Sequence, residues 1–381
     1  PAKLKVIDHY RETYECRSCR KNGTPYMEKA PVPYPPVLHS LASASTITWL
    51  IHQKFELSIP LYRQEKEWEA LGLRLSRATM SNWLLVVYRD WLVHIVHRLK
   101  LELLKQRYLH IDETHVQVLK EPGRKNTSDS YMWVYCSIRD AVNPIRYFEY
   151  QPGRSGKYPE AFLREYEGYI HTDAYSGYNA VSGVKRCLCY THLRRAFVDA
   201  LPKDIHNSEA SKPAEAILRL NQLFNIESEL EALPPDQKKK ERLIREKPLL
   251  EAFWSWAEKS AIGELPKSKL SKAFHYALNN REGFWNYLED GNCSISNSLA
   301  ENCIRPFVIG RKNWLFSGSP KGAEASAGIY TLVETAKANG LAPMKYIKYI
   351  LSDMPGSAFL EHPEYLDDYL PWNPLVKEFC R

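Results

Sequence analysis

Three acidic residues stand where the chain could hold divalent metal ions. Asp112 lies inside an apolar, β-rich run, HIDETHVQVL, where an acid is costly to bury without a partner or a metal. Asp173 ends a second strand-like segment, GYIHTDAY, and α/β sheets place ligands at such strand ends. Glu301 follows a predicted helix start at Ser296 or Asn297. Taken singly, each acid would more often be a surface or turn residue.

Together these acids suit one chemistry. Hard cations such as Mg²⁺ prefer carboxylate oxygens. Two such ions roughly 3.5–4 Å apart can activate an oxygen nucleophile and absorb charge on a transferring phosphoryl group. Asp112, Asp173 and Glu301 are therefore candidate catalytic residues and metal ligands for phosphodiester chemistry.

Basic and aromatic side chains accompany the acids. Five of them are candidates for contact with DNA phosphates: His192, Arg195, Arg305, Arg311 and Lys312. Arg binds phosphate oxygens bidentately, although surface solubility is the alternative for each one. Trp314 and Phe316 could stack on a splayed base, but packing in a core is the commoner role.

Histidines near the acids raise a different metal chemistry. His110, His115 and His171 could belong to a zinc hydrolase site. The sequence has no helical HExxH spacing around them, so this interpretation is the weaker one.

An α/β region must position the acids. Residues 108–202 read as three strands, helix, strand, helix, strand, helix, which predicts an RNase H-like mixed sheet. A charged helical segment, residues 203–279, interrupts the pattern and is interpreted as an insertion. The α/β pattern resumes over 280–351, and residues 352–381 form a C-terminal tail.

A wholly helical region, residues 38–107, precedes the sheet. A helix over Leu61–Ala70, a turn at Gly72 and a second helix capped by Ser76 through Trp83 predict a helix-turn-helix. Its second helix would present Arg77, Thr79 and Asn82 to phosphates and base edges. A plain antiparallel helix pair is the alternative. The run QKKKERLIREK, residues 237–247, is a solvated helix face or lies along DNA.

The N-terminal segment, residues 1–30, carries a cysteine pair, Cys16 and Cys19. A proline-rich linker, residues 31–37, follows and predicts a stiff spacer.

Composition limits the class of protein. The 381 residues are 44% hydrophobic and 25% charged, with net charge +7, which is ordinary for a soluble protein with a mild preference for polyanions. No apolar run approaches the roughly 18–20 residues of a membrane span, and no secretory signal is visible. The eight cysteines are scattered, which favours a reducing, cytoplasmic setting and no membrane partner.

Several segments together resemble one known family. IDETHVQVL, HTDAYSGY and CYTHLRRAF are similar to blocks of the insertion sequence 66 family of DDE transposases. The long segment from Ala300, AENCIRPFVIGRKNWLFSGSPKGAEASAGIYTLVETAKANGLAP, resembles that family's glutamate region, and LPWNP resembles its C-terminal element. The resemblance covers nearly the whole chain.

The resemblance implies an activity and its partners. A member would cleave and transfer DNA strands at the ends of an insertion sequence, with Mg²⁺ or Mn²⁺ held by Asp112, Asp173 and Glu301 in an RNase H-like domain. Its partners would be double-stranded terminal-repeat and target DNA, further copies of the chain and accessory proteins of the element. It would act in the bacterial cytoplasm, at the nucleoid.

The resemblance also implies a zinc ribbon ahead of the helical region. HYRETYECRSC is similar to its second half, whose first ligand pair would precede residue 1. Structural zinc takes four ligands. Cys16 and Cys19, with His9 as a third candidate, would therefore bind Zn²⁺ or stand as free thiols in a partial ribbon.

Two departures from the family pattern affect the expected activity. The family usually has Asp-Asn-Asn before the glutamate block and Glu-Arg within it, whereas this chain has Ser296-Asn297-Ser298 and Glu301-Asn302. Losing such outer groups costs roughly 10- to 100-fold in activity. The alternatives are a truncated or decayed copy that only binds DNA at element ends, and an unrelated RNase H-like nuclease.

Overall fold

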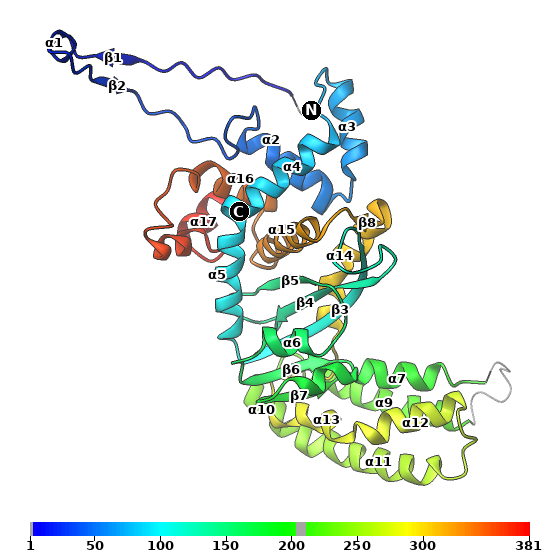
Figure 1. Ribbon diagram of the computed structural model, residues 1–381. Helices are drawn as coiled ribbons and strands as arrows, with labels where there is room; N and C mark the ends of the chain where they lie inside the picture. Colours follow the sequence, from blue (N-terminus) through cyan, green and yellow to red (C-terminus); the bar gives the residue numbers. More distant parts are fainter. Residues whose placement is uncertain (1–2, 203–210) are drawn as a thin grey trace. The chain divides into compact units, whose positions relative to one another are not determined.

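A computed structural model describes residues 3–202 and 211–381 of the chain (Figure 1). Contacts divide it into two compact units, Pro1–Ile95 with Leu341–Arg381, and Val96–Gly340. The start of the predicted helical insertion, at residue 203, lies outside the described residues.

The second unit is built around a mixed sheet. Its strands are β3 (Tyr108–Val118), β4 (Asp129–Ser137), β5 (Arg146–Gln151), β6 (Gly168–Thr172), β7 (Val184–Leu188) and β8 (Phe316–Ser317). Their order is β5-β4-β3-β6-β7, with β8 paired to β3. β3, β4 and β5 are antiparallel neighbours, whereas β6, β7 and β8 run parallel to β3.

Helices connect the strands in the predicted sequence of elements. They are α6 (Lys157–Phe162), the 3₁₀ helix η3 (Ser176–Ala180) and α7 (Tyr190–Val198). The prediction of a mixed α/β structure with additional helices is confirmed, and the long strand β3 lies at the centre of the sheet.

Two long helices complete this part, α14 (Ser298–Trp314) and α15 (Pro320–Ala338). α15 covers the edge strand β5. The Thr331 hydroxyl accepts a hydrogen bond from the Phe148 N–H at 2.8 Å, and the Thr335 hydroxyl accepts from the Arg146 N–H at 3.1 Å. These bonds satisfy donors that an edge strand would otherwise leave open to a further strand.

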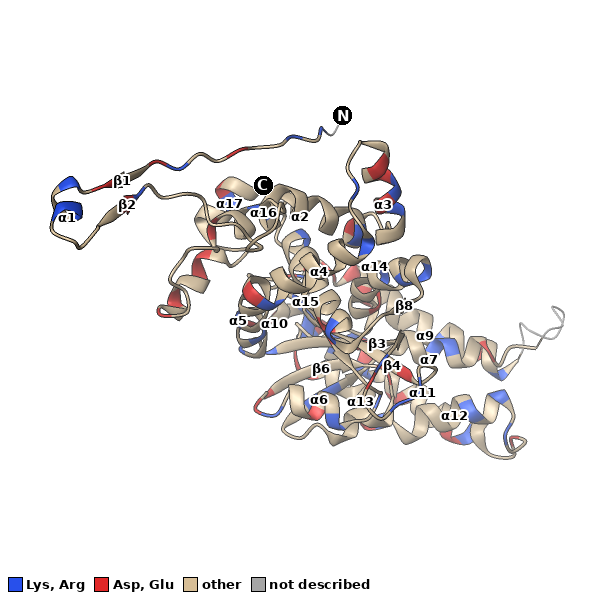
Figure 2. Cartoon of the chain, turned by 45° about the horizontal axis from the view of Figure 1, so that its top comes forward, with Lys and Arg blue, Asp and Glu red and all other residues tan. Residues whose placement is uncertain are grey.

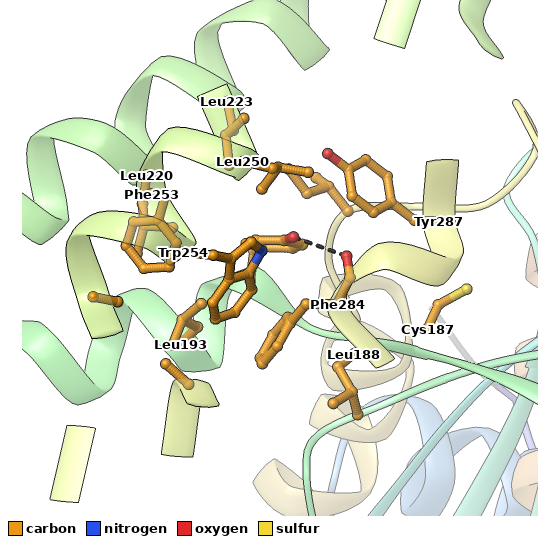
Figure 3. Close-up of a cluster of buried hydrophobic side chains, with 14 of the residues drawn as sticks. Cys187, Leu188, Leu193, Leu220, Leu223, Leu250, Phe253, Trp254, Phe284 and Tyr287 are labelled. Carbon is orange, nitrogen blue, oxygen red and sulfur yellow. Dashed lines mark hydrogen bonds between the residues drawn. The ribbon is translucent and has the colours of Figure 1, made fainter. Parts of the chain in front are cut away.

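A helical layer packs on the β7 side of the sheet (Figures 1 and 3). Its elements are α9 (Lys212–Glu229), α10 (Pro235–Glu241), the π-helix η4 (Arg242–Glu246), α11 (Lys247–Ala261), α12 (Lys269–Asn279), α13 (Arg281–Trp285) and the 3₁₀ helix η5 (Asn286–Glu289). Leu220, Leu250, Phe253 and Trp254 form a core with Leu193 of α7 (Figure 3).

The charged run 237–247 is only partly a solvated face. Lys239 and Lys240 are exposed, as predicted, but Arg242 and Glu246 are buried. Arg242 donates two hydrogen bonds to the Glu227 carboxylate, at 2.6 and 2.8 Å. It also donates to the Cys293 carbonyl at 2.8 Å. The run therefore braces the segment that leads into α14.

The first unit is mostly helical. After β1 (Thr13–Glu15), α1 (Arg17–Lys21) and β2 (Met27–Lys29), its elements are α2 (Ala44–Ile51), η1 (His52–Glu56), α3 (Leu61–Ala70), α4 (Arg77–Val87), η2 (Tyr88–Leu92), α16 (Pro343–Asp353), η6 (Pro363–Tyr369) and α17 (Pro374–Cys380). α16 packs against α2 and α17. α5 (Val93–Leu104) runs across the division between the units.

Helices α3 and α4 have the bounds that the sequence predicts, except that α4 continues to Val87. Gly72 takes a φ of +87° just after α3, a conformation that glycine adopts at little cost. The Ser76 hydroxyl caps α4 by accepting the Thr79 N–H at 3.1 Å. The Glu65 carboxylate accepts the Arg77 N–H at 2.9 Å, which joins the two helices.

Candidate active site

Two neighbouring parallel strands position the aspartates. β3 and β6 pair with His110 opposite His171. Asp112 and Asp173 each lie two residues beyond that pair, Asp112 within β3 and Asp173 directly after the end of β6. Their carboxylates therefore belong to the same end of adjacent strands.

The electrostatics of Asp112 join it to the other two acids. The pKa of Asp112 is raised to about 8, chiefly by burial and in part by the charges of Glu113, Asp173 and Glu301. The Glu113 backbone N–H opposes the shift. Mutual repulsion among partly buried carboxylates is what a bound divalent cation relieves, so the donor set fits a hard metal ion.

Glu301 comes close to Asp112 because the start of α14 is hydrogen-bonded to β3. The side-chain amide of Asn297, the residue before α14, donates to the Ile111 carbonyl at 2.8 Å. Its amide oxygen lies 3.0 Å from the ring Nδ1 of His110, and its backbone N–H donates to the Cys189 sulfur at 3.1 Å. Glu301 lies in the first turn of α14.

The Arg154 guanidinium forms an ion pair with Glu113, the acid next to Asp112. Arg154 donates from Nε to the Glu113 carboxylate at 2.6 Å, and the Tyr178 hydroxyl donates to the other oxygen at 2.5 Å. Arg154 lies 3.9 Å from an Asp173 oxygen and stacks over the Tyr175 ring. The network therefore joins Glu113 of β3 to the segment around Asp173.

A second arginine shapes the turn after β6. Arg186 donates to the Asp173 carbonyl at 2.6 Å and to the Tyr175 carbonyl at 2.8 Å. The Tyr175 N–H donates to the Asp173 carboxylate at 3.0 Å. These bonds fix the direction in which Asp173 leaves the strand.

His192, which is predicted to contact DNA, is half-buried and lies against Glu301. Its Nδ1 is 3.7 Å from the Glu301 carboxylate. One potential ligand atom each of Cys189, His192 and Glu301 lies within 4.8 Å of the others.

The comparisons with known proteins decide the family. A model described as Transposase IS66 family matches residues 39–325. The chain belongs to the IS66 transposase family. It is also 26%, 26% and 27% identical to the uncharacterized proteins y4hP, y4jD and y4qI of Sinorhizobium fredii (strain NBRC 101917 / NGR234). These matches cover 98% of this chain and 68%, 73% and 69% of the relatives.

Membership confirms the resemblance drawn from the sequence and gives this transposase a role in transposition. Such an enzyme processes DNA, and the family suggests a divalent metal. Among the described residues, no helix combines the length and the apolar character needed to cross a membrane.

The basic residues predicted to contact DNA differ in their surroundings. Arg195, Arg305 and Lys312 are exposed, and basic residues on α14 are blue in Figure 2. Arg311 turns inward and donates to the Thr114 hydroxyl at 3.1 Å. In the transposase's first unit, Arg77, Thr79 and Asn82 are all exposed on α4.

The histidines of the weaker zinc hypothesis are engaged in other contacts. His110 stacks on His171, with ring centroids 4.2 Å apart. His171 accepts the Ser294 N–H at 2.8 Å through Nε2, and its Nδ1 lies 3.1 Å from the Leu109 carbonyl. His115 stacks on Tyr131. Phe316 is exposed, and Trp314 is half-buried.

The cysteine pair near the N-terminus lies at the end of a short hairpin. Cys16 precedes α1 and Cys19 lies within it, between the paired strands β1 and β2. A contact with the Cys19 backbone and side chain lowers the pKa of the Cys16 thiol. In the described part of the chain, a second group of three potential metal ligands consists of His171, Cys187 and Cys293, and this cysteine pair belongs to neither group.

Sequence reasoning missed several residues that build the site. From the sequence, Asn297 is a candidate helix start and part of a departure from the family pattern, and Glu113, Arg154 and Arg186 have no predicted role. Glu113 stood directly beside Asp112, so a second acid in the same buried strand was the available signal.

Proposed function

We propose that this chain is a DDE-type transposase that cleaves and transfers DNA strands at the ends of an insertion sequence. Asp112, Asp173 and Glu301 would hold two Mg²⁺ or Mn²⁺ ions. The observation that carries the proposal is the raised pKa of Asp112, to which the charges of Asp173 and Glu301 both contribute.

The sheet supports an RNase H-like catalytic domain. An antiparallel meander, β3 to β5, is followed by two parallel strands beside β3. The acids then lie on the central strand, directly after its parallel neighbour, and on a helix packed against the same central strand. This is the arrangement that a two-ion carboxylate site requires.

The chain's own residues would orient the substrate. When bound, the metal ions would supply an activated water and charge stabilisation at the phosphoryl group. Arg311 has no carboxylate partner among the described residues, and it lies beside Thr114, two residues from Asp112 on β3. Its guanidinium is thus available to a phosphate oxygen.

DNA recognition would fall to α3 and α4 as a helix-turn-helix. Arg77 and Asn82 are exposed on α4, which suits contact with phosphates and base edges. The same proposal includes assembly of several copies on DNA, help from accessory proteins of the element and action at the bacterial nucleoid. It also includes Zn²⁺ bound at Cys16 and Cys19.

A copy that binds element ends without cutting them is the second candidate. Asn302 is exposed next to Glu301, where the family pattern has arginine, so a cation beside the site is missing. The Ser296 and Ser298 hydroxyls lie 3.0 Å from each other rather than reaching the acids.

A cleavage assay separates the two candidates. Full-length protein with Mg²⁺ and linear element-end DNA should nick or join strands. Asp112→Asn, Asp173→Asn and Glu301→Gln should each lower the rate by roughly 100-fold or more while DNA binding persists. The matched control is Glu167→Gln, an exposed acid ahead of β6, which should cleave normally. If the protein binds element-end DNA but does not cleave it with any metal, the second candidate is favoured. If it cuts DNA without preference for element ends, a general nuclease is favoured.

A further inference from the structure

Cys189, His192 and Glu301 bring three different kinds of ligand atom together. A sulfur, a ring nitrogen and a carboxylate oxygen lie within 4.8 Å of one another. Cys189 is the N-cap residue of α7, His192 lies in that helix's first turn, and Glu301 lies in the first turn of α14. The starts of the two helices are joined, because the Tyr190 N–H donates to the Ile295 carbonyl at 3.0 Å.

Two of the three atoms lack a hydrogen-bond partner. Within the described residues, His192 Nδ1 and Glu301 Oε1 are both buried and unpaired. They lie 3.7 Å apart, too far for a hydrogen bond between them. A buried polar atom left unsatisfied costs about 1–3 kcal/mol, so two of them facing each other indicate a missing ligand.

The Cys189 sulfur is buried and already faces backbone donors. It accepts the Asn297 N–H at 3.1 Å. Burial and the Glu301 charge raise the pKa of the Cys189 thiol, while the backbone N–H groups of Asn297 and His192 oppose that shift. A cation bound to the sulfur would deprotonate the thiol outright.

We propose that Cys189, His192 and Glu301 bind one borderline divalent cation, such as Zn²⁺ or Co²⁺. Thiolate and imidazole select such ions, whereas sites made of carboxylates alone suit Mg²⁺. Three protein ligands leave a coordination position open for water or a substrate oxygen. The site shares Glu301 with the proposed carboxylate centre, but its occupancy needs neither DNA nor catalysis and so goes beyond the proposed function.

Cobalt binding tests the proposal directly. Full-length protein carrying Cys16→Ser and Cys19→Ser, which removes the other close cysteine pair near the surface, is titrated with Co²⁺ in excess Mg²⁺. The expected result is one Co²⁺ per chain with thiolate-to-cobalt charge-transfer absorption. Cys189→Ser should abolish that absorption. His192→Gln and Glu301→Gln should raise the cobalt dissociation constant by at least roughly tenfold.

The matched control is Cys380→Ser, a buried cysteine that belongs to neither group of potential metal ligands, and it should keep the absorption; circular dichroism verifies that each variant is folded. Absorption that survives Cys189→Ser, absorption lost in Cys380→Ser, or none in the folded parent overturns the proposal. Cobalt binding through Cys189 without DNA cleavage in any metal would support this site and refute the proposed activity. Mg²⁺-dependent DNA cleavage without cobalt absorption would support the proposed activity and refute this site.

Discussion

Asn297 joins the start of α14, which carries Glu301, to β3, which carries Asp112, and to the start of α7. Its side chain binds His110 and Ile111 next to Asp112, and its backbone N–H binds Cys189. Burial lowers the pKa of His110, and the nearby His171 lowers it further, so that His110 is held neutral. A neutral ring can donate from Nδ1 to the Asn297 amide oxygen. Asn297 is therefore a positioning residue for Glu301.

Replacing Asn297 should weaken both the fold and the chemistry. Asn297→Ala leaves the Ile111 carbonyl and His110 without partners, which should lower the free energy of unfolding by about 2 kcal/mol. Urea denaturation measures that loss, and the cleavage rate should fall because Glu301 is no longer held in place. Ser298→Ala, at an exposed neighbour, should change stability by less than about 0.5 kcal/mol. Equal stability of the two variants would contradict this role.

The sequence predicted the acids but not the residues that hold them. Asp112, Asp173 and Glu301 stood out because acids are unusual in apolar strands or match a family block. The partners of Asn297 lie up to 187 positions away along the chain, and no local pattern reports such contacts. The short distance from His192 to Glu301 likewise depends on how α7 and α14 meet, so the sequence does not predict it.

At the scale of elements, η4 ties the helical layer to the segment before α14. Arg242 is fully buried and binds the Glu227 carboxylate and the carbonyls of Tyr287, Asp290 and Cys293. A buried pair is strongly destabilising to break, because the remaining charge is uncompensated.

Arg242→Met should therefore lower the free energy of unfolding by about 3–5 kcal/mol. Chemical denaturation measures this loss. Arg245→Ala removes an arginine from the same turn whose partner, Glu229, is exposed, and it should cost at most about 1 kcal/mol. If Arg242→Met is as mild as the control, the helical layer does not depend on this ion pair.

Glu246 in the same π-helix gives a pH dependence. The pKa of Glu246 is raised to about 8, chiefly by burial and in part by the charge of the Glu227 carboxylate. A carboxyl group with a raised pKa contributes stability below its usual pKa near 4.5, and that stability is lost as pH rises through about 8. Glu246→Gln imitates the protonated form, so its melting temperature should exceed that of the wild type at pH 8.5.

At pH 5 this advantage should largely disappear, because the wild-type carboxyl group is then mostly protonated. Thermal unfolding at both pH values measures the difference. A gain that is the same at pH 5 and pH 8.5 would contradict a titrating Glu246.

The sequence predicted the positions of helices and strands better than it predicted which of their side chains are buried. The order of strands and helices along the chain followed from β-rich runs at hairpin-like spacing, and α3 and α4 followed from the turn at Gly72 and the cap at Ser76. The run 237–247 was interpreted as solvated or DNA-facing, yet Arg242 and Glu246 are buried. Its π-helical turn departs from the usual period of 3.6 residues per turn. The spacing of charged residues in this run therefore does not predict which of them face solvent.

At the scale of the whole molecule, the net charge of +7 and the exposed residues of α4 lead to a prediction about DNA binding. If Arg77 neutralises one phosphate, Arg77→Ala should reduce the slope of log affinity against log salt concentration by about 0.9. Fluorescence anisotropy with element-end DNA over a salt series measures it. Arg139→Ala removes an exposed arginine of the other unit, paired with Glu231, and should leave the slope unchanged. An unaltered slope in Arg77→Ala would argue for a plain helix pair.

The proposed metal centre is tested most directly by locating the metal. Anomalous X-ray scattering from Mn²⁺, in crystals of the full chain bound to element-end DNA, places the ions independently of activity. We expect two manganese peaks roughly 3.5–4 Å apart, coordinated by the carboxylates of Asp112, Asp173 and Glu301. Crystals with manganese bound only elsewhere, or with DNA bound and no manganese between Asp112 and Asp173, would contradict this expectation.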